Sequence, residues 1–91
     1  MSSAEIFRRK IITYIEENKD PLIKAAFYSD EEVMNIMRSL TERWERSGFQ
    51  GVPLDYATYE ELKILAEKAE YYKDAPRETF LRKIFREEFS D

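Results

Sequence analysis

The chain contains no cysteine and no histidine among its 91 residues. Without thiols it can form neither disulfides nor a cysteine-ligated zinc site. Without imidazole it also lacks the Ser–His and Cys–His pairs of nucleophilic catalysis. No run approaches the roughly 18 apolar residues that a membrane span requires. We therefore expect no metal, no cofactor, no catalytic residue and no membrane association, and a protein that is not an enzyme.

The charged and apolar residues that are present indicate a small globular protein. Fifteen Lys and Arg against 19 Asp and Glu leave a net charge of -4, and 43% of the residues are hydrophobic. Six Phe, six Tyr and one Trp are too many large apolar side chains for a disordered chain of this charge. We expect a single domain over residues 1–91. The first five residues lack the basic-then-apolar order of a signal peptide, which favours a cytoplasmic location.

Neutral amides are scarce, and the polar residues are mostly charged. Asn occurs twice and Gln once. Few thermolabile residues together with abundant Glu, Lys and Arg is the composition of many hyperthermophile proteins. The alternative is chance in a short helical chain. The composition favours a thermophile.

Capping signals and apolar spacing predict an all-α fold of about five short helices. Ser2–Glu5, Ser29–Glu32 and Thr58–Glu61 each have the pattern of a capping box, and Asp20-Pro21 places an N-cap before a proline at the first helical position. Apolar residues follow each start at helical spacing, and no alternating strand pattern lasts four residues. The expected helices cover about residues 2–18, 20–28, 29–48, 55 or 58 to 74, and 76–89.

The only long loop expected, residues 48–57, contains both glycines and several large apolar residues. Gly48 suits the left-handed position after a helix, and Phe49 the apolar contact beyond it. Loops are usually polar, so Phe49 and Val52 raise two alternatives. The loop folds back on the core, which Phe49 favours, or it presents an apolar surface to a partner.

Neither the carboxylates nor the glycines form a recognisable chemical motif. The acidic clusters, such as Glu16-Glu17 and Glu60-Glu61, are sequence neighbours, which diverge by about 100° on a helix instead of converging on a metal. Gly48 and Gly51 lack the Lys and Ser/Thr of a phosphate-binding loop. Catalysis would need a tertiary convergence that the sequence does not indicate.

Exposed apolar residues are the main candidate binding sites. In the expected fourth helix, Ile64 and Tyr71 lie roughly 160–180° from the core stripe at 100° per residue, and one heptad apart. Tyr is enriched at protein interfaces. Ile64, Tyr71, Phe49 and Val52 are therefore the expected partner-binding residues. The alternative for Ile64 and Tyr71 is burial by helices packed on two sides.

Two basic clusters leave nucleic acid as an alternative partner. Arg8, Arg9 and Lys10 lie in the expected first helix, and Arg82, Lys83 and Arg86 in the fifth. On a shared face they would attract phosphates despite the net negative charge. Solvated helix faces with local ion pairs are the simpler interpretation.

These observations favour a non-catalytic accessory or adaptor subunit that binds a larger protein assembly. The thermophile-like composition suggests an archaeal DNA-replication or other nucleic-acid-processing complex. No sequence motif identifies such a complex. The alternative is a small nucleic-acid-binding or transcription-regulatory helical domain that uses the two basic clusters. A homodimer through Ile64 and Tyr71 also stays open.

Overall fold

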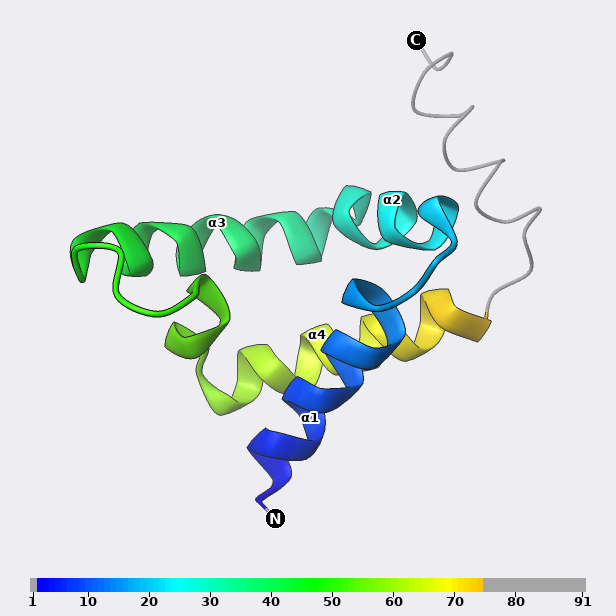
Figure 1. Cartoon of the computed structure of the whole chain (residues 1–91), viewed down its shortest axis with the longest axis horizontal. Coiled ribbons are helices and arrows are strands. Elements are labelled where there is room, and N and C mark those ends of the chain that lie inside the picture. The colour runs from blue at the N-terminus through cyan, green and yellow to red at the C-terminus, as the bar shows by residue number, and fades with distance from the viewer. Residues whose placement is uncertain (1, 75–91) are drawn as a thin grey trace, which may run out of the picture.

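The computed structural model describes residues 2–74, and this part of the chain is an all-α fold, as predicted (Figure 1). The helices are α1 (Ser3–Ile11), α2 (Pro21–Ser29), α3 (Glu31–Arg46) and α4 (Tyr59–Asp74). A π-helical turn, η1 (Ile12–Glu16), extends α1, and a short 3₁₀ turn, η2 (Pro53–Tyr56), precedes α4. The predicted fifth helix, with Arg82, Lys83 and Arg86, lies outside the described residues.

Local capping explains where most of these helices begin. The Glu61 amide donates to Thr58 Oγ1 at 3.2 Å, and the Thr58 amide donates to Glu61 Oε1 at 2.8 Å, so the predicted capping box is complete. Asp20 accepts from the Leu22 amide, with Pro21 at the first helical position. Ser2 accepts from the Glu5 amide at 3.2 Å. Three of the predicted helix starts are thus confirmed.

The start of α3 differs by one residue from the prediction. Ser29 is the last residue of α2, and Asp30 is the N-cap of α3. The Asp30 carboxylate accepts from the amides of both Glu32 and Val33. Asp30 also joins α2 to α3 without an intervening loop, which explains why the cap is shared between the two helices.

The core lies where α1 and α2 meet α4. Figure 1 shows α1 crossing α4 obliquely, while α2 and α3 follow each other in a nearly straight line on one side of this pair. The largest fully buried side chains are Phe27, Ile15, Leu40, Leu65 and Val33, contributed by η1, α2, α3 and α4. Burial of such side chains is the main stabilising contribution to a domain of this size, at about 1.5–3 kcal/mol each.

A buried polar cluster joins the start of α3 to the end of α4. Asp30 is only 7% exposed, and its Oδ2 accepts from Tyr72 Oη at 2.7 Å and pairs with Lys68 Nζ at 3.1 Å. Burial alone would raise the pKa of Asp30. The hydrogen bonds from Tyr72, the Val33 amide and Lys68 outweigh it, so the pKa is below its usual value. The carboxylate is therefore held ionised within the fold.

The loop before α4 makes contacts with the end of α3. Gly48 adopts φ +81°, as predicted, and Gly51 adopts φ +69°. Trp44 Nε1 donates to the Gly51 carbonyl at 3.0 Å, and the Trp44 ring packs edge-on against Phe49.

Within residues 2–74 no helix has the length and apolar character needed to cross a membrane.

Candidate functional site

An apolar central cavity of about 330 Å³ lies between α1, η1, α2, α3, η2 and α4. Its volume is at the lower end of the range of small-ligand pockets. The lining side chains are mostly apolar: Ile11, Ile12, Phe27, Met37, Val52, Pro53, Leu54 and Leu65, with Arg8, Glu16 and Tyr28 as the polar members.

Side chains from six elements meet around the cavity: α1, η1, α2, α3, η2 and α4. Figure 1 shows α3 separated from α1, with α2 joining them at one end and η2 approaching from the other. Leu65 of α4 and Phe27 of α2, both fully buried, line the cavity. Tyr28 and Val52 are 37% and 49% exposed, which places an aromatic and an aliphatic side chain where solvent reaches the cavity.

The polar side chains of the central cavity are paired with each other or with neighbouring elements. Arg8 forms an ion pair with Asp55 at 2.5 Å, which links α1 to η2. Tyr28 Oη donates a hydrogen bond to Glu16 Oε1. Burial and this hydrogen bond raise the pKa of Tyr28 well above its usual value, so the phenol stays protonated and acts as a donor. The arrangement favours binding of an apolar group over acid–base chemistry.

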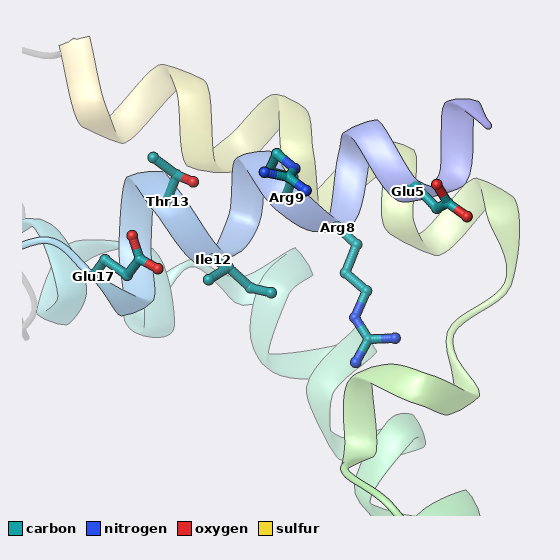
Figure 2. Close-up of a pocket in the computed structure, with 6 residues that line it drawn as sticks. All are labelled: Glu5, Arg8, Arg9, Ile12, Thr13 and Glu17. Atoms are coloured by element: carbon teal, nitrogen blue, oxygen red, sulfur yellow. The ribbon is translucent and has the colours of Figure 1, made fainter. Parts of the chain in front are cut away.

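A second, shallower concavity of about 350 Å³ adjoins the central cavity along α1. We call this surface the α1 face. Figure 2 shows its six side chains distributed along α1 and η1: Glu5, Arg8, Arg9, Ile12, Thr13 and Glu17. Arg8 and Ile12 line both concavities, so the two are adjacent.

The π turn η1 decides which side chains share the α1 face. The Glu17 amide donates to the Ile12 carbonyl at 2.9 Å, so five residues close this turn instead of four. On an uninterrupted α-helix, Arg9 and Glu17 would diverge by about 80° at 100° per residue. The extra residue in the turn reduces this divergence, and both side chains line the same concavity. Such π turns are frequent at functional sites.

The predicted partner-binding residues do not form one surface. Phe49 and Val52 are both large exposed side chains of the loop, but only Val52 lines the central cavity. Tyr71 of α4 is 56% exposed, whereas Ile64 is half-buried. The Tyr71 ring packs edge-on against the buried Tyr72 at 5.0 Å between centroids.

The basic cluster of α1 is largely paired with acidic residues. Arg8 is held by Asp55, and Lys10 Nζ lies 3.6 Å from Glu70 Oε2 of α4. Arg9 is exposed on the α1 face beside Glu5 and Glu17. The first half of the predicted nucleic-acid site is therefore a surface of mixed charge, which attracts phosphates weakly. Its second half lies outside the described residues.

Residues 2–74 contain no group of three or more acidic side chains placed to hold a metal ion. The acidic cluster at the start of α3 has a structural explanation, since Asp30 and Glu32 both contact Lys68 of α4. Glu61 is also engaged, because Arg43 donates to both of its carboxylate oxygens, at 2.6 and 3.0 Å.

Sequence reasoning missed the central cavity and several of its members, including Met37, Tyr28 and Leu54. Met37 belongs to the apolar stripe of α3, and stripe position does not distinguish a core residue from a cavity wall. Ile12 gave a signal, because it falls off the main apolar stripe of the first helix. Comparisons with protein families, with curated proteins and with solved structures found no match for this chain.

Proposed function

We propose that this protein is a non-catalytic helical adaptor whose central cavity receives a large apolar side chain of a partner protein. The observation that supports the proposal is the apolar lining of this cavity together with the exposed Tyr28 and Val52 beside it. Protein interfaces are typically centred on aromatic or aliphatic anchors in desolvated pockets with a polar surround. Arg8, Asp55 and Glu16 supply such polar groups next to the cavity.

The partner segment that this cavity suits is a short amphipathic peptide or helix with one protruding apolar residue. A cavity of about 330 Å³ has room for one or two large side chains, but not for a whole helix. Charged flanking residues of the partner would meet the mixed charges of the α1 face. The net charge of -4 favours flanking basic residues on average.

The test uses random twelve-residue peptides displayed on phage and selected on the immobilised full-length chain. A selected peptide is then titrated into protein carrying ¹³C-labelled methionine methyl groups. The Met37 methyl group should shift because Met37 lines the cavity. The Met34 methyl group, on the exposed side of α3, serves as the internal control and should not move.

Substitutions locate the binding surface. Val52→Lys places a charge beside the cavity at an exposed position and should weaken peptide binding more than tenfold. Tyr71→Ala and Ile64→Ala change the other predicted surface and should leave the affinity unchanged. The opposite result, with binding lost in Tyr71→Ala and kept in Val52→Lys, would refute the cavity as the site.

The nucleic-acid alternative and the archaeal replication complex enter the same design as competing outcomes. A lysate of an archaeal hyperthermophile supplies candidate partners, with nuclease added in one arm. Capture counts for the proposal only if Val52→Lys abolishes it. Capture that nuclease removes, and that weakens steeply with salt, would support the nucleic-acid interpretation instead.

A further inference from the structure

Two charges of opposite sign, Arg9 and Glu17, lie on either side of the centre of the α1 face, while Glu5 and Arg8 lie towards its N-terminal end. Arg9 precedes the centre of the face, Ile12 and Thr13 occupy the centre, and Glu17 follows it. Thr13 is four residues from Arg9 and four from Glu17, so the two charges lie on opposite sides of Thr13 along the helix axis. Arg9, Thr13 and Glu17 are all exposed, and Ile12 is partly so.

From this pattern we propose that the α1 face binds the α1 face of a second copy of the chain in antiparallel orientation. A two-fold axis beside Thr13 would place Arg9 of each copy opposite Glu17 of the other. Ile12 and Thr13 of the two copies would then pack together where the helices cross. A two-fold interface of this kind is isologous, because each contact occurs twice.

The charges also select this orientation against the parallel one. Parallel packing in register would place Arg9 against Arg9 and Glu17 against Glu17, and like charges in contact repel. Arg8 does not compete for the partner's carboxylate, because it is paired with Asp55 of η2. The π turn η1 contributes by bringing Glu17 back onto the face that carries Arg9.

The contact is small and mostly polar, which determines the kind of dimer expected. Ile12 is the only large apolar residue of the α1 face, so apolar burial contributes little. Such an interface is smaller than the standard size of stable complexes, and its ion pairs are screened by salt. The dimer should therefore be weak, with dissociation favoured by raising the ionic strength from about 20 mM to about 500 mM.

A charge-swap experiment on the full-length chain tests the proposal by sedimentation velocity at low ionic strength. Wild type should show a concentration-dependent monomer–dimer equilibrium, and Arg9→Glu and Glu17→Arg should each be monomeric. An equimolar mixture of the two variants should regain the dimer, because each variant then meets the complementary charge on the other. Arg38→Glu, at an exposed position of α3, is the control and should behave as wild type.

A second readout uses the absence of cysteine. The proposed axis passes beside Thr13, so Thr13→Cys should form an intermolecular disulfide much faster than Lys63→Cys, an exposed control on α4. A wild-type chain that stays monomeric at millimolar concentration would overturn the proposal. So would a dimer that Arg9→Glu leaves intact, and if Tyr71→Ala disrupts that dimer the interface lies on α4. These tests change Arg9, Thr13 and Glu17 and leave Val52 and Met37 in place, so failure of the dimer can be distinguished from failure of the proposed partner cavity.

Discussion

Tyr72 donates a hydrogen bond to Asp30 across 42 residues of sequence, with 2.7 Å between Tyr72 Oη and Asp30 Oδ2. Asp30 is at the same time the N-cap of α3 and the partner of Lys68. This one carboxylate therefore caps α3 and also holds the last turns of α4 against the start of α3. Because Asp30 is buried, losing any one of its donors leaves charge less well compensated.

Tyr72→Phe is expected to destabilise the fold by about 1–2 kcal/mol, since it removes a buried charge-assisted hydrogen bond while keeping the ring. Tyr71→Phe removes the same hydroxyl group from the exposed neighbouring residue and should change stability by less than about 0.5 kcal/mol. Urea unfolding followed by circular dichroism compares the two. Equal losses would mean that the Asp30 contact contributes nothing specific.

Acid should destabilise the protein partly through Asp30. Its folded pKa lies below the ordinary 3.8, so its contribution is fully present above about pH 4. That contribution is lost as the pH falls through the lower folded value. Urea midpoints measured from pH 7 down to pH 2 should decline less steeply in Asp30→Asn, from a lower starting value, than in wild type.

Glu61 serves as the comparison for this titration. Its pKa is also lowered, chiefly by the hydrogen bonds from Arg43, so it too contributes stability above its usual 4.5 and loses it in acid. Glu61→Gln should remove a separate part of the acid-dependent loss. If Asp30→Asn and wild type follow parallel profiles, the Asp30 carboxylate is not held ionised by the fold.

The two glycines of the loop should respond differently to alanine. Both have positive φ, so Gly48→Ala should cost about 1 kcal/mol from backbone strain alone, because nothing lies within 4 Å of the added Cβ. In Gly51→Ala the new Cβ would lie 2.5 Å from Asp55 Oδ2. Thermal unfolding followed by Trp44 fluorescence should show the larger loss for Gly51→Ala. A loss no greater than that of Gly48→Ala would contradict the close approach of Asp55.

Arg43→Lys should lower the urea midpoint, whereas Arg46→Lys should not. Arg43 donates to both Glu61 oxygens and to the Tyr56 carbonyl, a two-pronged geometry that an ammonium group cannot reproduce. Arg46 forms only a loose, exposed ion pair with Glu42 at 4.0 Å. Urea unfolding of both variants is measured at two salt concentrations. An unchanged midpoint in Arg43→Lys would rule out a stabilising role for the paired hydrogen bonds from Arg43 to Glu61.

The sequence by itself determined the helical class and most helix starts, because these depend on contacts between near neighbours. Thr58 and Glu61 are three residues apart, and a capping box needs nothing from the rest of the fold. For the same reason the N-cap at Asp20-Pro21 and the left-handed conformation of Gly48 could be predicted from the sequence. Local reasoning failed at the start of α3, because Ser29 and Asp30 are adjacent and either could be the N-cap. The structure has Asp30 as the N-cap, where Tyr72 and Lys68 of α4 also contact it.

The tertiary structure alone decided the surfaces proposed for binding. Arg8 and Asp55 are 47 positions apart, and their pairing leaves Arg9 as the exposed cation of the α1 face. The π turn that brings Glu17 near Arg9 has no capping or periodicity signal, because it changes the helical period on which that reasoning relies. The central cavity is lined by residues as far apart in sequence as Arg8 and Leu65, and only helix packing brings such residues together.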